Sequence, residues 1–283
     1  MSRLPRPFHA FTFAGLLLAP LALPPATAHG GTAVVMLRYR FVPGQTLAYH
    51  FVATGRATAT GDLSIRDGFT TPYRSSANVI VREHVLSVDA QGRATVAVSV
   101  RILRATETRG RTTTTSPTAQ TTTVRIAPDG GVSGATGTAA NDAFFLPLGT
   151  LPPGPLAAGA RWVSPSRLLR TLTPADAAHY PHPTVTNTLL RARSAAGAGM
   201  ATISSAARPF YAPMTFLGGG GTTLRLGGSG QATGQTVFDV AAGRLIASTA
   251  SYTLEVDQQL RDRRGGVRRA RTRITWQMST RRV

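Results

Sequence analysis

Residues 94–102 read ATVAVSVRI, a stretch in which apolar and polar side chains alternate. Valine or isoleucine stands at positions 96, 98, 100 and 102, with small, polar or basic residues between them. Successive side chains of a β-strand point to opposite faces, so this pattern predicts a strand with one buried and one solvated face. Such half-buried strands are typical of antiparallel sheets.

The same period of two recurs elsewhere in the chain. It runs through residues 246–256 and 269–278, and through two short stretches, 37–41 and 47–51. The two short stretches flank Pro43-Gly44. This pair suits a type II turn, because Pro fixes φ at the first central position and Gly accepts a positive φ at the second. We therefore expect 37–41 and 47–51 to be strands of one hairpin.

Further turn signals lie between the β-type stretches, and helix signals are few. Turns are expected where Gly, in some cases with Asp, interrupts the alternation, at 89–93, 128–131, 196–199, 239–243 and 264–266. Short helices are expected only at Thr138–Leu146 and Pro174–His179. The predicted fold class is mainly β, an antiparallel meander of hairpins that forms a curled sheet, a half-barrel or a sandwich.

The N-terminus has the features of a secretory signal peptide. Arg3 and Arg6 precede an apolar stretch that ends in Pro24-Pro25-Ala26-Thr27-Ala28, and small residues in this spacing favour cleavage before His29. A membrane anchor or buried helix is the alternative, but the prolines would break a spanning helix. We expect residues 1–28 to be removed, and the mature chain to be exported, to the periplasm, cell envelope or exterior, with no transmembrane segment.

A segment rich in Pro and Gly, residues 147–160, predicts a boundary between two β-rich parts. The N-terminal half would span 29–150 and the C-terminal half 151–283. Asp89-x-x-Gly92-Arg93 in the first half is echoed by Asp239-x-x-x-Gly243-Arg244 in the second. This echo leaves two interpretations open, two similar halves or two unrelated hairpins that share ordinary turn residues.

Three motifs carry a resemblance to known proteins. They are LRYRFVPGQTLAY at 37–49, LPPGPLAAGARW at 151–162 and FDVAAGRL at 238–245. The chain resembles exported bacterial β-rich proteins of a family of unknown function in its opening hairpin, its middle linker and its late hairpin. No activity comes with that resemblance, which implies the architecture alone.

The amino-acid composition excludes some kinds of site and suggests one kind of partner. The chain has no Cys, which excludes disulfides, thiolate metal sites and thiol catalysis. Its 31 basic residues are all Arg and outnumber 12 acidic ones, for a net charge of +19. Such a charge suggests an anionic partner, although an exported protein rarely meets nucleic acid, and the absence of Lys is typical of compositional bias. We expect no nucleic-acid partner.

No constellation of residues predicts catalysis or a cofactor. His179 and His182 form a His-x-x-His pair, but Pro181 and Pro183 prevent the helix that would aim both at one metal ion. His50 and His84 fall within strands, and Gly228-Ser229-Gly230 lacks the strand-to-helix context of a nucleophilic serine. We therefore expect a protein that is not an enzyme, with no catalytic residue, metal or cofactor.

The basic C-terminus is a candidate polyanion site. Arg269, Arg271 and Arg273, the Arg ladder, alternate with apolar residues and would share the water face of one strand. Guanidinium groups bind phosphate and sulfate in bidentate fashion. The competing interpretation is that a hairpin turning near Arg264-Gly265 brings the two acids Glu255 and Asp257 opposite the two arginines Arg271 and Arg273.

The apolar phases of the strands define the second candidate site. The candidate groove residues are Tyr49, Phe51, Val98, Tyr252, Leu254 and Trp276. A curled sheet that gathers these side chains on one side would accept a lipid or another apolar molecule. We expect binding of an apolar ligand or a protein partner; the alternative is binding of anionic lipid or envelope polysaccharide through the Arg ladder.

Overall fold

The computed structural model describes residues 34–62, 73–109, 112–115, 119–136, 150–165, 184–193, 199–208, 210–217 and 221–283. Within these ranges all regular secondary structure is β. The predicted signal peptide, both predicted short helices and the His179/His182 pair lie outside the described residues.

Thirteen strands are named in chain order. They are β1 (Thr46–Gly61), β2 (Tyr73–Val88), β3 (Ala94–Arg109), β4 (Thr112–Thr115), β5 (Ala119–Ile126), β6 (Val132–Thr136), β7 (Arg161–Pro165), β8 (Thr184–Arg193), β9 (Met200–Ala207), β10 (Phe210–Leu217), β11 (Thr223–Asp239), β12 (Arg244–Arg261) and β13 (Val267–Arg282).

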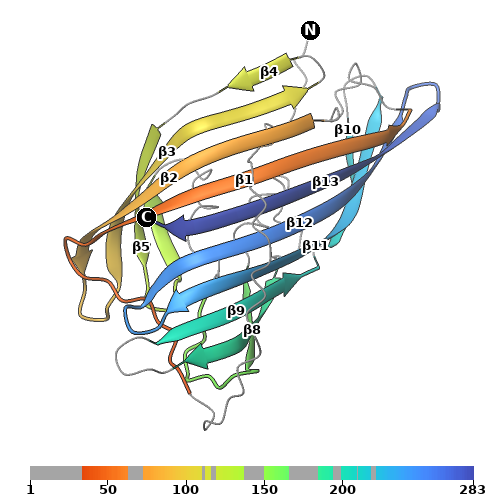
Figure 1. Ribbon diagram of the computed structural model, residues 1–283. Helices are drawn as coiled ribbons and strands as arrows, with labels where there is room; N and C mark the ends of the chain where they lie inside the picture. Colours follow the sequence, from red (N-terminus) through yellow and green to blue (C-terminus); the bar gives the residue numbers. More distant parts are fainter. Residues whose placement is uncertain are drawn as a thin grey trace, which may run out of the picture.

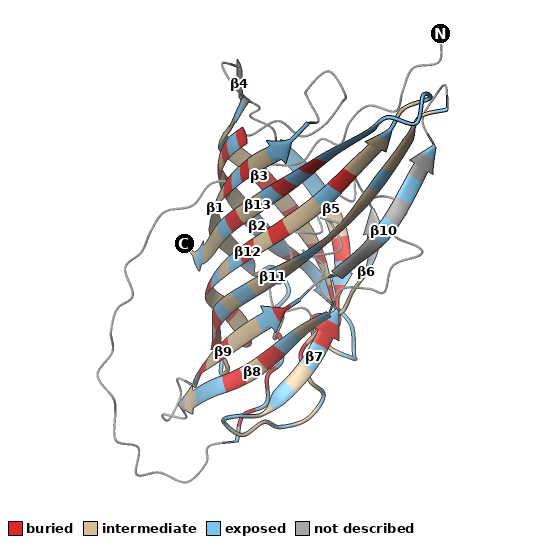
Figure 2. Cartoon of the chain, turned by 90° about the vertical axis from the view of Figure 1, so that its right-hand side faces the viewer, coloured by how far each residue is buried: buried red, intermediate tan, exposed pale blue. Residues whose placement is uncertain are grey.

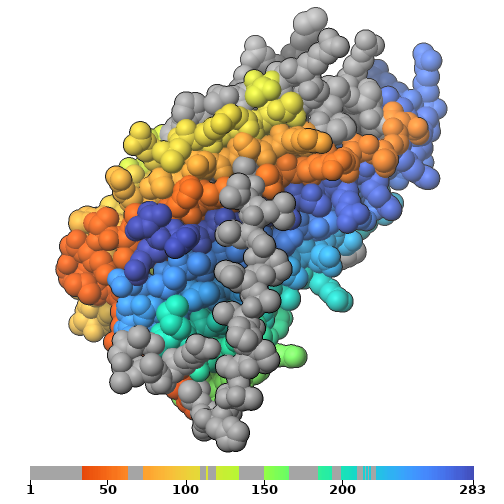
Figure 3. Space-filling view, in the orientation of Figure 1, coloured from red at the N-terminus to blue at the C-terminus, as the bar shows by residue number. Residues whose placement is uncertain are grey.

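The strands form one antiparallel sheet that is strongly curled and not closed (Figure 1). Its order is β6-β5-β3-β2-β1-β13-β12-β11-β9-β8-β7, with β4 beside β3 and β10 beside β11. The predicted curled meander is therefore correct. The first and last strands, β1 and β13, pair along thirteen residue positions from Tyr49 to Gly61, and Figure 3 shows them side by side on the outer surface. The parts of the chain before and after the 147–160 segment therefore belong to one continuous sheet.

Burial alternates along the strands as the sequence predicts (Figure 2). In β3, Val96, Val98 and Val100 are buried, and the residues between them are at most half-buried. In β13, Ala270, Thr272 and Trp276 are buried while Arg271 and Arg273 are exposed. The sheet therefore has a concave inner face that carries the apolar phase and a convex outer face that carries Ser, Thr, Gln and Arg.

The predicted turns form where Gly and Asp permit them. The Gln45 N–H donates to the Val42 carbonyl at 3.0 Å, and Gly44 has a φ of +79°, as a type II turn requires. Carboxylate oxygens of Asp89, Asp129 and Asp239 each accept backbone N–H groups of their own turns, at 2.8–2.9 Å. These carboxylates therefore stabilise their own turns.

The prediction of a strand at 37–41 is wrong. Residues 34–41 are extended, but only Val35 forms a ladder contact, an isolated bridge to Leu156. β1 pairs with β2 instead. At the turn, the Gly44 N–H donates to the Val85 carbonyl, and the Val85 N–H donates to the Gln45 carbonyl. The alternation of Leu37 and Tyr39 with Arg38 and Arg40 serves a different purpose, since it turns the apolar side chains toward the concave face.

This N-terminal segment, residues 34–41, connects distant parts of one end of the sheet. The Tyr39 N–H donates to the Pro128 carbonyl at 2.7 Å, and the Arg40 N–H donates to the Gly243 carbonyl at 3.0 Å. Pro128 lies in the β5–β6 turn and Gly243 in the β11–β12 turn. The segment therefore joins the hairpin at one margin of the sheet to a hairpin in its interior.

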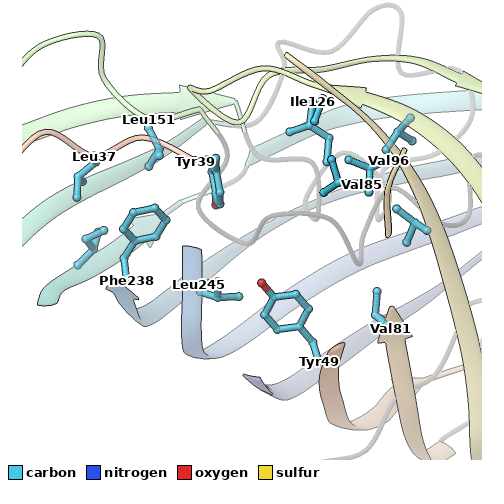
Figure 4. Close-up of a cluster of buried hydrophobic side chains, with 14 of the residues drawn as sticks. Leu37, Tyr39, Tyr49, Val81, Val85, Val96, Ile126, Leu151, Phe238 and Leu245 are labelled. Carbon is cyan, nitrogen blue, oxygen red and sulfur yellow. The ribbon is translucent and has the colours of Figure 1, made fainter. Parts of the chain in front are cut away.

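The main core lies under this segment (Figure 4). The Tyr39 ring packs edge-on against Phe238, with centroids 5.3 Å apart, and Leu37, Val79, Val98, Ile126 and Leu189 are fully buried in the same cluster. The main core thus joins side chains from nearly every strand at one end of the inner face. Burying a large apolar side chain contributes about 1.5–3 kcal/mol, so this end carries most of the fold's apolar stabilisation.

We predict that Gly243→Ala destabilises the fold by detaching the N-terminal segment. Gly243 has a φ of +61°, and a Cβ there would meet the Arg40 backbone nitrogen at 2.6 Å and the Arg38 carbonyl oxygen at 2.7 Å. Gly265→Ala is the matched control, because Gly265 also has a positive φ, +82°, but has open space around it. In urea unfolding, Gly243→Ala should cost about 1–3 kcal/mol more than Gly265→Ala. Equal costs would show that the segment does not need this close contact.

Candidate ligand-binding face

All six candidate groove residues lie on the inner face, in two separate apolar clusters. Tyr49, Phe51 and Val98 belong to the main core. Tyr252, Leu254 and Trp276 belong to a second cluster with Ala207, here called the Trp276 cluster. The sheet therefore brings the six residues to one side, but not into one continuous contact.

The Trp276 cluster is built on an aromatic pair. Tyr252 and Trp276 are cross-strand neighbours on β12 and β13, and their rings stack with centroids 5.5 Å apart and planes inclined by 16°. On the other side of Trp276 stands Gly55 of β1, where an added Cβ would lie 2.4 Å from the indole nitrogen. The indole ring therefore lies across the β1 backbone, and only glycine at position 55 leaves room for it.

A row of mostly small side chains separates the two clusters. In register across six strands, this central row consists of Ala77, Ala53, Met278, Ala250, Gly234 and Ser205. Of these residues only Ala77 packs in the main core, and none belongs to the Trp276 cluster. Between the main core and the stacked aromatic pair, the inner face therefore carries mostly short side chains.

Most buried polar groups of the inner face are paired with one another. Asn187 donates to Ser164 at 2.9 Å and accepts from Ser205 at 2.7 Å. Gln258 donates to Thr272 at 2.8 Å. Such pairing is the rule for buried polar groups, because an unpaired one costs about 1–3 kcal/mol.

Some buried polar atoms depart from this rule, and those of Tyr39, Arg244 and Arg282 belong to one group. This buried polar cluster consists of Tyr39, Tyr49, Glu83, Arg244 and Arg282, at the end of the inner face that the N-terminal segment covers. Tyr49 stands directly opposite Arg282 on β13. It is also diagonal to Glu83 on β2, since Leu47 pairs with Glu83 and Tyr49 with Val81. Figure 4 shows the Tyr39 and Tyr49 hydroxyls directed toward the same part of the core.

The groups of the cluster influence the pKa values of its two tyrosines. Burial raises the pKa of Tyr49 above its ordinary value; Glu83 raises it further, and Arg282 and Arg244 lower it. Burial is likewise the main cause of the raised pKa of Tyr39, with smaller contributions from Tyr49 and Glu83. Burial alone raises the pKa of Glu83 to about 7. A carboxyl group with this pKa exchanges its proton near neutral pH.

No sequence motif predicts this cluster, although one local signal for it is present in β2. In β2 the buried phase contains Val79, Val81, Glu83 and Val85. Because Glu83 shares the face of these valines, its carboxyl group must be buried in the core, which is costly for a charged group. His84, the next residue, is exposed on the outer face and lies 2.9 Å from the Thr46 hydroxyl.

The Arg ladder lies on the outer face, where two of its members face acidic residues. Arg271 is opposite Asp257 and Arg273 is opposite Glu255, while Arg269 is opposite Gln259. The Arg271 Nε donates to Asp257 at 2.7 Å, and Arg273 Nε lies 3.9 Å from Glu255. The predicted hairpin pairing is therefore correct. Exposed pairs of this kind add little to stability, and they reduce the positive charge that the ladder offers to a polyanion.

The described residues also bear on metal binding and membrane insertion. Among them, no group of three or more His, Asp or Glu residues is placed to hold a metal ion. In the same ranges, no helix has the length and apolar character required to cross a bilayer. No protein-family model matches the chain, and no curated protein matches it significantly. The resemblance to exported β-rich proteins stays a prediction.

We predict that Glu83 makes the protein lose stability as pH rises from about 5 to 8. Its pKa in the folded state, about 7, exceeds the ordinary value of 4.5, so between these values the folded state binds more protons than the unfolded state. The free energy of unfolding should therefore fall across this interval, by up to about 3 kcal/mol. Glu83→Gln stays neutral and should lack this contribution.

The measurement is urea unfolding of both proteins at pH 5, 6, 7 and 8. Glu83→Gln should gain stability relative to the unmodified protein as the pH rises, because other titrating groups are common to both. A difference between the two proteins that stays constant with pH would show that Glu83 does not titrate in this way.

Proposed function

We propose that this chain is an exported, non-enzymatic binding protein whose inner face holds an apolar ligand. The observation that carries the proposal is the contrast between the two faces of one curled sheet. The inner face presents two apolar clusters and a shallow row between them, while the outer face presents polar and basic residues. A concave, mostly apolar surface with few polar groups is the usual form of a small-molecule site.

The stacked aromatic pair supports the proposal. Aromatic side chains offer large apolar contact areas with little loss of conformational freedom. Tyr252 and Trp276 border the central row, whose Ala250 and Met278 are only half-buried. An apolar molecule lying along this row would contact the aromatic pair on one side and the main core on the other.

Export is part of the proposal and rests on residues 1–28. A secreted or envelope protein without Cys relies on its core alone for stability. The same compartment offers lipids and other apolar molecules that need shielding from water. An apolar segment of a protein partner is the other candidate occupant of the inner face.

We predict that an uncharged apolar dye binds to the central row. N-phenyl-1-naphthylamine should bind residues 29–283 saturably, with increased fluorescence. Ala250→Leu should weaken binding roughly ten-fold by filling the row, at a cost comparable to overpacking. Ser251→Leu is the matched control, because Ser251 is the neighbouring residue on the exposed outer face.

Two further results would decide the matter. Urea unfolding must show that both variants fold, since otherwise lost binding has another cause. Equal binding by Ala250→Leu and Ser251→Leu would overturn the proposed location. A native mass spectrum of protein purified from its own envelope should show an added small-molecule mass; an added polypeptide would favour a protein partner instead.

The alternative function, binding of anionic lipid or polysaccharide through the Arg ladder, has weaker support because Asp257 and Glu255 face two of its three arginines. We predict that changing Arg269, Arg271 and Arg273 together to Ser weakens binding to phosphatidylglycerol vesicles no more than two-fold beyond a control. The control changes Arg56, Arg74 and Arg101 to Ser, which are also exposed and remove the same charge. Selective loss in the first variant would establish the ladder as a site.

A further inference from the structure

We infer that the buried polar cluster binds the acidic head group, a carboxylate or phosphate monoester, of an amphipathic ligand whose apolar tail lies along the inner face. This inference rests on the proposed function and specifies the chemical class of its ligand. It is carried by hydrogen-bond donors that the fold buries together without giving them partners.

Two arginines supply the charge. The Nε atom of Arg244 and one terminal nitrogen of Arg282 are buried without a hydrogen-bond partner. Among the described residues, neither arginine forms an ion pair. Both side chains are half-buried as a whole, so they are neither free in water nor satisfied by protein. An unpaired buried donor on a charged group is costly, and an anion removes the cost.

The two arginines come from neighbouring strands at the same end of the sheet. Arg282 is the last residue of β13 and stands opposite Tyr49, which places it on the inner face. Arg244 is the first residue of β12, and its neighbour Gly243 accepts a hydrogen bond from the Arg40 N–H, next to Tyr39. Both guanidinium charges lower the pKa of the Tyr49 hydroxyl.

Tyrosine hydroxyls complete the set of donors. The Tyr39 hydroxyl is buried without a partner, in a side chain that is only 5% exposed. It lies near the Tyr49 hydroxyl, which raises the pKa of Tyr39. Two guanidinium groups and two tyrosine hydroxyls match the several acceptor lone pairs of a carboxylate or phosphate.

Glu83 is the one acidic group of the cluster, and it does not balance the arginines. Among the described residues it forms no ion pair with either of them. The cluster therefore has two fixed positive charges against at most one negative charge. The remaining positive charge is what an acidic head group would neutralise.

The path of the tail follows β13. From Arg282 the inner-face residues continue through Thr280 and Met278 to Trp276. The six residue steps from Arg282 to Trp276 span roughly 20 Å at about 3.3 Å per residue. A long alkyl chain covers this distance, from the buried polar cluster across the central row to the stacked aromatic pair.

The test compares ligands that differ in head group only. Dodecanoate, dodecyl phosphate and dodecanol are titrated below their aggregation limits into residues 29–283 carrying Trp162→Phe, so that Trp276 is the only tryptophan reporter. We expect at least one acidic ligand to bind about ten-fold or more tightly than dodecanol, as hydrogen bonds to charged groups imply. The acid that binds more tightly identifies the head group.

Variants locate the effect. Arg282→Gln and Arg244→Gln should each abolish the preference for the acidic ligand, and Tyr39→Phe should reduce it while preserving the packing of the ring. Arg281→Gln is the matched control: it removes the same charge from the adjacent residue, which is exposed on the outer face. It should keep the full preference. Circular dichroism and urea unfolding verify the fold of each variant.

The outcomes separate the two proposals. Equal affinity for dodecanol and both acids would overturn the head-group site and leave the apolar inner face intact. Equal loss of preference in Arg281→Gln and Arg282→Gln would also overturn it, because only overall charge would matter. Failure of all three ligands to bind would overturn the proposed function and the head-group site together.

Discussion

Burial of one face of a long antiparallel sheet is the constraint on which this structure depends. The strands present a mostly apolar phase on one face, and no described helix or second sheet covers it. Curling brings that phase together on the inner side and leaves the outer side to Ser, Thr, Gln and Arg. Burial alternates along the strands accordingly (Figure 2). The hydrophobic effect scales with area removed from water, so the curl and the alternation are two aspects of one free-energy term.

An open curled sheet must also be closed at its ends, and residues 34–41 do this at one end. The N-terminal segment reaches the β5–β6 turn at one margin and the β11–β12 turn in the interior of the sheet, and it adds Leu37 and Tyr39 to the main core. Its arrival has an electrostatic consequence, because it covers Glu83 and the arginines near Tyr49. The same packing that stabilises the fold thereby produces the buried polar cluster, the most chemically distinctive part of the inner face.

The sequence predicts the strands and turns well because their physics is local. Alternation in ATVAVSVRI and the Pro43-Gly44 turn each depend on a few neighbouring residues. The role of residues 37–41 could not be predicted, because an alternating segment fits a hairpin and a core-covering segment equally. Arg244 and Arg282 lie about two hundred positions from Tyr49 in the sequence. They approach it only because the first strand pairs with the last. Only the glutamate in the apolar phase of β2 gave a local sign of the site.

Cysteine accessibility along β12 tests most directly that alternate residues occupy two different environments. The chain has no Cys, so single cysteines placed at each position from 248 to 254 report without background. We predict that a water-soluble maleimide labels positions 249, 251 and 253 rapidly and positions 248, 250, 252 and 254 slowly. Uniform labelling, or a period near 3.6 residues, would contradict the two-faced sheet and every inference drawn from its inner side.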